Sequence, residues 1–167
     1  KIPVLNGETD TASLMAYGYD PELSSLSPYK GAMAAVIEAM SKLVAAGIDP
    51  KHAWLSFQEY FGRTGDNPEK WGKPFAALLG ALKAQAELEV AAIGGKDSMS
   101  GTFEDIDVPP TLIAFAVSTA KASRIVTNEW KAKDHYIYAV MPEYDENGIA
   151  DFNSVRGVFD KVYSLIN

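Results

Sequence analysis

The stretch TLIAFAVSTA, residues 111–120, decides the fold because it is the clearest strand in the chain. It is long and nearly all apolar, and it contains no Gly or Pro. A run of this composition is typical of a strand covered by other elements, so we place it at the centre of a sheet. Weaker strands are expected at residues 13–19 (SLMAYGY), 52–57 (HAWLSF), 90–93 (VAAI) and 135–142 (HYIYAVMP).

Three segments show the periodicity of amphipathic helices. The first begins at Ser27-Pro28, a capping hydroxyl followed by Pro at the first helical position, and ends near Gly47. Its apolar side chains recur at helical spacing: Ala32, Met33, Val36, Ile37, Met40, Leu43 and Val44. The other two helices are expected over residues 74–88 and 151–166.

The order of these elements predicts a mixed α+β fold. The strand at 135–142 and the helix after it have no sheet of their own, and such a pair is rarely stable alone. We therefore expect one unit over residues 1–134 and the truncated start of a second over residues 135–167. The chain also lacks an initiator Met, which indicates a processed chain or an excised piece of a longer protein.

The composition excludes several classes of function. The chain has 167 residues, of which 47% are hydrophobic and 22% charged, as in globular proteins. A net charge of −7 argues against nucleic acid as the main partner. The absence of Cys excludes disulfides, thiolate metal sites and a Cys nucleophile. No apolar run approaches the roughly 20 residues that span a membrane, and KIPVLNGETD lacks the apolar core of a signal peptide. These features are compatible with the cytosol.

The stretch VAAIGGKDSMSGTF, residues 90–103, places polar chemistry directly after an apolar run. A short strand is expected to open into a turn at Gly94-Gly95, followed by Lys96, Asp97, Ser98 and Ser100. A P-loop is excluded, because Val90 stands where its first glycine belongs and Asp97 where Ser or Thr belongs. Backbone N–H groups of a glycine turn, with a Lys and a Ser, still suit a phosphate. From spacing alone, a phosphate contact and a solvated β-turn both remain open.

Other polar residues are weaker candidates. Glu38 interrupts an apolar helix, either as a metal ligand or acid–base group, or as the surface partner of Lys42 four residues on. The two histidines each precede a strand and have no catalytic or metal-ligand spacing around them. The polar residues 58–74 are expected to form a long loop, which carries function or merely covers the sheet. The acidic residues 104–107 are interpreted as a turn.

With these motifs laid out, the chain resembles phosphoribosylformylglycinamidine synthase, the glutamine-dependent enzyme of the fourth step of purine synthesis. The resemblance lies in SPYKGAMAAVIEAMSKLVAAGIDP (27–50) and AIGGKDSMSGTFEDIDVPPTLIAFAV (92–117). FGRTGDNPEKWGKPF and SLMAYGYDPELS extend it over essentially the whole chain. The segment GGKDSMSG is specific for the long form of the enzyme.

The resemblance implies a place in the enzyme and a fold. It places the chain in the second of two tandem synthase halves. Residues 1–134 would be the N-terminal subdomain, with the fold of aminoimidazole ribonucleotide synthetase, and residues 135–167 would begin the next subdomain. The implied fold has a mixed or antiparallel sheet with helices on one face, and such subdomains pair sheet to sheet. We therefore expect the isolated chain to form a two-fold dimer.

The resemblance also implies a reaction. The whole enzyme uses ATP and Mg²⁺ to activate the formyl amide oxygen of formylglycinamide ribonucleotide, and ammonia from a glutaminase domain then displaces phosphate. The implied partners are the other synthase half and the glutaminase domain, in the cytoplasm. The catalytic residues of the family belong to other segments, so the chain alone should be inactive. The alternative is a scaffold subdomain that contacts no ligand.

The family's ligand contacts carry over to the glycine motif. Gly95 matches a glycine that contacts nucleotide, and Ser98 matches a serine that contacts substrate. Gly94 and Lys96 complete the predicted binding set. Lys96 replaces a metal-binding Asn, so it would meet phosphate as a point charge. Phe57 stands where the small form of the family has an Asp that contacts ATP, which removes that contact.

One further position matches a metal ligand of the family. Glu38 corresponds to a Glu that binds metal at a second, structural nucleotide site of long-form enzymes. Lys42 stands in place of the Asn that partners it, and an ammonium group competes with a cation. Glu38 is nevertheless the one metal ligand that the resemblance predicts here.

Overall fold

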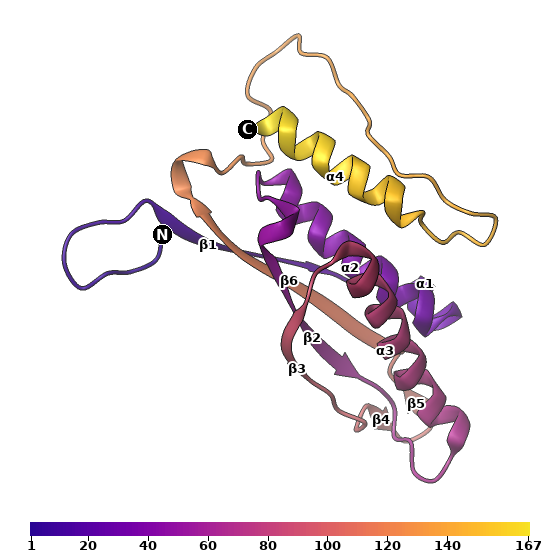
Figure 1. Ribbon diagram of the computed structural model, residues 1–167. Coiled ribbons are helices and arrows are strands. Elements are labelled where there is room, and N and C mark those ends of the chain that lie inside the picture. The colour runs from indigo at the N-terminus through magenta and orange to yellow at the C-terminus, as the bar shows by residue number, and fades with distance from the viewer.

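A four-stranded sheet in the order β1–β6–β2–β3 forms the centre of the computed structural model, which describes residues 1–167 (Figure 1). The strands are β1 (Thr11–Gly18), β2 (Ala53–Tyr60), β3 (Ala92–Lys96) and β6 (Thr111–Lys121). Strand β6 pairs antiparallel with both β1 and β2, whereas β2 and β3 are parallel. The sheet is therefore mixed, and the central position predicted for residues 111–120 is confirmed.

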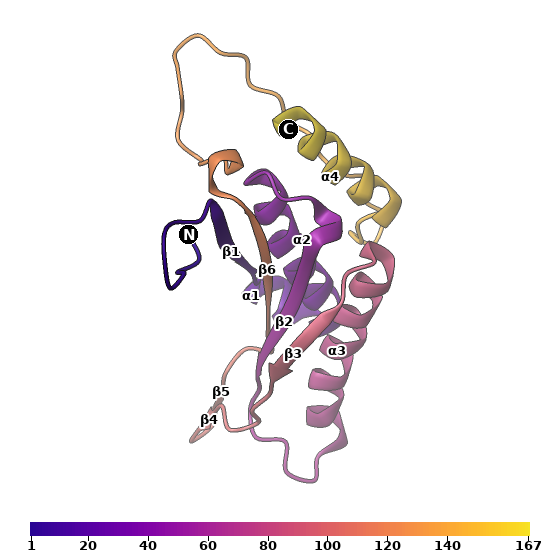
Figure 2. The same ribbon diagram turned by 60° about the vertical axis from the view of Figure 1, so that its left-hand side comes forward.

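Helices cover one face of this sheet (Figure 2). They are α1 (Pro21–Leu26), α2 (Pro28–Ala45), α3 (Pro68–Leu88) and α4 (Phe152–Ile166). Helix α2 packs on β1 and β6 and against α3, and α4 lies outside this layer on α2 and α3. The largest fully buried apolar side chains come from α2, β2 and α4: Val36, Met40, Leu43, Val44, Leu55 and Val155. The α+β class with helices on one face is thus confirmed.

Side-chain capping sets where the long helices begin. Ser27 Oγ accepts from the Lys30 N–H at 3.3 Å, directly before Pro28, as the sequence predicts. Asn67 Oδ1 accepts from the N–H of Glu69 at 2.9 Å, so α3 begins at Pro68. The prediction that this helix begins at residue 74 is therefore wrong, because the capping Asn stands earlier. The expected loop over 58–74 shrinks to the residues between Tyr60 and Pro68.

The other face of the sheet is uncovered. In β6 the even-numbered residues 112–118 are buried under the helices, while the odd-numbered ones point away. Met15 and Val117 are register partners on this second side, as are Tyr17 and Phe115. The Tyr17 and Phe115 rings lie 6.4 Å apart between centroids. We call this surface the open face; its apolar residues are Met15, Tyr17, Trp54, Ile113, Phe115 and Val117.

The segment between β6 and α4 differs from its prediction. Residues 135–142 form no strand, and the chain arches away from the body here (Figures 1 and 2). Tyr136 and Tyr138 are 88% and 82% exposed. A strand needs a neighbour for its backbone hydrogen bonds, and this chain supplies none at this place. Of the residues 104–107, which were predicted to form a turn, only Glu104 and Asp105 do so; they connect β4 (Thr102–Phe103) to β5 (Ile106–Asp107). None of the helices is both long and apolar enough to span a membrane.

Candidate functional site

The glycine motif lies in edge strand β3 rather than in a turn. Gly94 and Gly95 pair in parallel register with Ser56 and Phe57 of β2, so the turn predicted at these glycines is wrong. The physical reason is close packing of two backbones: a Cβ atom on Gly95 would stand 2.5 Å from the carbonyl oxygen of Phe57. Because β3 is an edge strand, one side of its backbone has no partner within the sheet.

The residues after β3 are anchored to the end of β2. The Ser98 N–H donates to the Glu59 carbonyl oxygen at 3.1 Å, and the Phe61 N–H donates to the Ser98 carbonyl oxygen at 2.9 Å. The Ser98 and Ser100 hydroxyls lie 2.8 Å apart. The Lys96 side chain is exposed and makes no ion pair or side-chain hydrogen bond. Gly94, Gly95, Lys96 and Ser98 are thus brought together on one edge of the sheet.

Glu59 is the residue of this edge whose environment the sequence did not reveal. It was expected in a polar loop, but it ends the buried face of β2 and is only 5% exposed. Its Oε1 atom is buried and has no hydrogen-bond partner. Burial, with a smaller contribution from the negative charge of Asp97, raises the pKa of Glu59 to about 7. The signal that points to the burial of Glu59 is the alternation of inward and outward residues along β2, in which Ala53 and Leu55 are also buried.

Glu38 lies near the opposite edge of the sheet, beside β1. Its Oε2 atom accepts from the Tyr19 N–H at 2.9 Å, and its Oε1 atom lies 2.7 Å from the Lys42 ammonium. Lys42 also donates to the Tyr17 carbonyl oxygen at 2.7 Å and sits 4.6 Å from the centre of its ring. The pairing of Glu38 with Lys42, one of the two predicted alternatives, is therefore present. No group of three or more His, Asp or Glu side chains is placed to hold a metal ion.

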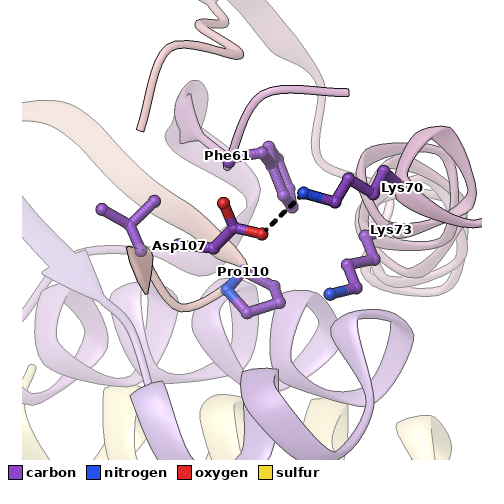
Figure 3. A pocket seen from close by; sticks show the side chains of 7 residues that line it. Phe61, Lys70, Lys73, Asp107 and Pro110 are labelled. Carbon is purple, nitrogen blue, oxygen red and sulfur yellow. Dashed lines mark hydrogen bonds and ion pairs between the residues drawn. The ribbon is translucent and has the colours of Figure 1, made fainter. Parts of the chain in front are cut away.

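A small polar pocket joins the start of α3 to the β4–β5 hairpin (Figure 3). Lys70 and Lys73 extend from α3 toward Asp107, and the Lys70 ammonium lies 3.0 Å from Asp107 Oδ2. The Thr102 hydroxyl donates to Asp107 Oδ1 at 2.5 Å. The hydrogen bond from Thr102, followed by that from Lys70, holds the pKa of Asp107 below its ordinary value. The satisfied carboxylate indicates a structural clasp rather than a ligand site.

Comparison with known proteins points to one family. No family model matches the chain. The phosphoribosylformylglycinamidine synthase subunit PurL of Haloarcula marismortui is 30% identical over 107 residues, which are 62% of this chain and 14% of that protein. The PurL subunit of Thermococcus sibiricus is 24% identical over 140 residues, or 83% of this chain and 19% of that protein. The chain therefore spans less than a fifth of these relatives.

Comparison with solved structures leads to the same enzyme as comparison with sequences. Thermotoga maritima PurL complexed with FGAR superposes with a TM-score of 0.67 at 13% identity, covering 93% of this chain and 23% of that one. The chain resembles part of phosphoribosylformylglycinamidine synthase. The Thermotoga maritima PurL structure complexed with ATP gives a TM-score of 0.63 at 17% identity, covering 74% of this chain and 20% of that one. At these identities the synthase structures show the fold, and the fold agrees with the expected resemblance.

Proposed function

We propose that the chain is a segment of a phosphoribosylformylglycinamidine synthase and contributes ligand contacts to its active site. The observation that carries this proposal is the edge segment Gly94–Ser98, which combines the open backbone at Gly94 with an unpaired Lys96 ammonium and the Ser98 hydroxyl. The reaction would join ammonia from glutamine to formylglycinamide ribonucleotide at the expense of ATP, with Mg²⁺, in the cytoplasm.

The chemistry of this edge suits a phosphate group. Lys96 offers a compact positive charge, which binds phosphate as a point charge and does not ligate Mg²⁺. Ser98 offers a hydroxyl that donates to or accepts from a ligand. Gly94 lets a ligand approach the backbone without meeting a side chain. Phosphoryl transfer is accelerated mainly by positioning and charge stabilisation, which such contacts can provide to reacting groups held elsewhere.

The rest of the synthase would complete the site. We propose that residues 1–134 form the N-terminal subdomain of the second synthase half and that residues 135–167 begin the following subdomain. The exposed Tyr136 and Tyr138 fit this view, because a neighbouring sheet would cover them. The catalytic groups would lie outside this chain, so the chain alone would have no synthase activity.

The open face would be the surface that pairs with the other synthase half. Met15 and Tyr17 are 69% and 59% exposed there, and Trp54 is 46% exposed. A contiguous apolar surface of this kind marks an interface. In the isolated chain, a second copy would occupy it and give a two-fold dimer.

Glu38, which we expect to bind a metal ion, is occupied by other contacts in this structure. Both carboxylate oxygens are engaged, one by the Tyr19 N–H and one by the Lys42 ammonium. Glu38 is available to a metal ion only after Lys42 has moved. We therefore propose Glu38 as a ligand of the auxiliary site only in states of the enzyme in which this pair is broken.

The second candidate function is a scaffold that supports the active half without touching ligand. The uncovered open face favours it, as does Phe57, whose side chain cannot make a polar contact with ATP. Steady-state kinetics of the full-length enzyme with Lys96→Ala separate the two, with the exposed Lys51→Ala as the control. Ligand contact predicts that kcat/KM for ATP or formylglycinamide ribonucleotide falls on the order of 10- to 100-fold, the loss of one charge-assisted contact. Kinetics like those of the control would favour the scaffold.

A further inference from the structure

Glu59 combines burial with an unsatisfied polar atom. Its Oε1 atom lacks a hydrogen-bond partner, although the residue is only 5% exposed. Native proteins pair nearly all buried polar atoms, so each exception calls for a physical explanation. An ionised carboxylate in this position would be costly, whereas a protonated one is neutral.

The charges around Glu59 are few. The buried face of α2 carries no ionisable side chain, and neither does that of α3. Leu112, its register partner on β6, is apolar. On the other side, the β3 segment supplies the exposed cation Lys96 and the carboxylate Asp97. Asp97 is the charge that adds to burial in disfavouring ionised Glu59.

Glu59 is also directly linked to the proposed ligand segment. Its carbonyl oxygen accepts from the Ser98 N–H. Two residues further along, the Phe61 N–H donates to the Ser98 carbonyl oxygen, and the Phe61 carbonyl oxygen accepts from the Gly101 N–H. The Gln58 amide reaches the Lys96 carbonyl oxygen at 3.4 Å. The Glu59 backbone is thus hydrogen-bonded directly to the segment that carries Lys96 and Ser98, and its carboxyl group is close enough to Asp97 for the two negative charges to interact.

We propose that the Lys96–Ser98 segment takes up a proton when it binds a phosphate-bearing ligand, and that Glu59 is the residue that holds this proton. The inference rests on the proposed function of the segment. The only bond formed is the O–H bond of the Glu59 carboxyl group, and the proton comes from solvent. Glu59 is a positioning residue in this scheme, because it does not touch the ligand.

The direction of the effect follows from electrostatics. A bound phosphate adds negative charge beside Glu59 and Asp97, which favours protonated Glu59 still further. Because a bound anion promotes the protonation of Glu59, linkage requires that the anion bind more tightly at pH values at which Glu59 is protonated. The affinity for an anion should therefore fall as the pH rises through about 7, the pKa of Glu59 in the free protein.

The test uses sulfate, a phosphate analogue that stays dianionic across this range, and follows the amide signals of Lys96 and Ser98 by NMR. We expect sulfate to bind roughly 3- to 10-fold more tightly at pH 6 than at pH 8, since one pKa unit corresponds to a tenfold linkage. Glu59→Gln should lose this dependence, and the exposed Glu146→Gln should keep it. The Glu59 carboxyl carbon, followed in the same samples, should titrate at higher pH when sulfate is present.

The outcomes separate this proposal from the function on which it rests. Sulfate that shifts these amides equally at pH 6 and pH 8, or equally in the two variants, overturns the role of Glu59 and leaves the ligand site standing. If neither sulfate nor ATP perturbs the segment at any pH, in wild type or in Glu59→Gln, the ligand site itself is refuted and the proton linkage with it.

Discussion

Gly95 lies so close to Phe57 that a Cβ atom on the glycine would stand 2.5 Å from the Phe57 carbonyl oxygen and 3.2 Å from its nitrogen. A Cβ atom on the neighbouring Gly94 would meet no other atom within 4 Å. Two adjacent glycines of one motif thus differ in role. Gly95 sets how closely β3 approaches β2, and Gly94 leaves space that a ligand can occupy.

Replacing Gly95 by Ala should weaken the sheet. The added methyl group must push β3 away from β2, which we expect to lower the free energy of unfolding by roughly 1–3 kcal/mol. Gly94→Ala is the matched control and should change stability by less than about 0.5 kcal/mol. Urea unfolding of both variants checks this. Equal stabilities for the two would show that the close contact is not rigid.

Glu59→Gln should stabilise the protein above neutral pH. The folded-state pKa of Glu59 is raised from 4.5 to about 7, so its contribution to stability is fully present below pH 4.5 and is lost as the pH rises through about 7. Gln cannot ionise, so the variant escapes this loss and should be more stable by roughly 1–3 kcal/mol at pH 8. Near pH 5 the difference should shrink. A stability difference that does not vary between pH 5 and pH 8 would contradict the raised pKa.

Lys42→Asn should free Glu38 for cations. The ammonium now lies 2.7 Å from Glu38 Oε1, and its removal takes away a competing positive charge. We expect Mn²⁺ to broaden the Tyr19 amide signal at concentrations on the order of tenfold lower than in wild type. The double variant with Glu38→Gln should show no such broadening. Broadening of wild type at low Mn²⁺ that Glu38→Gln alone abolishes would mean that Lys42 does not block the site.

Trp54→Glu should disrupt self-association. Trp54 lies opposite Val117 on the open face and is 46% exposed, so a carboxylate there would be buried in the expected dimer without a partner. Sedimentation should show a dimer for wild type and an affinity at least about tenfold weaker for the variant. Leu26→Glu, at the end of α1 and 85% exposed, is the control. A wild-type chain that stays monomeric at high micromolar concentration would refute the dimer.

The parts of the fold that could be predicted are those that local chemistry specifies. Residues 111–120 are apolar enough to be central in any sheet, and Ser27-Pro28 begins α2 because a hydroxyl cap and a proline act within one turn. Residues 135–142 have the composition of a strand as well. They fail to form one because pairing depends on a partner strand, which composition does not encode.

The candidate site was predicted in its residue types but not in its geometry. Gly94 and Gly95 were expected in a turn, because glycine more often supplies unusual backbone angles than close contact. Here Gly95 is needed for the approach of Phe57, a long-range relationship. Glu59 was hidden for a similar reason, since a carboxylate at a strand end predicts exposure unless the strand's register is known.

The central claim is that Lys96 and Ser98 contact a phosphate-bearing ligand. The most direct test is titration of the isotope-labelled chain with ATP and Mg²⁺, followed through its amide signals at pH 6.5. The account predicts saturable shifts confined to Gly94–Ser98 and the facing residues of β2, with affinity lowered on the order of tenfold or more in Lys96→Ala and unchanged in Lys51→Ala. Saturable shifts located elsewhere, or equal in wild type and Lys96→Ala, would contradict it.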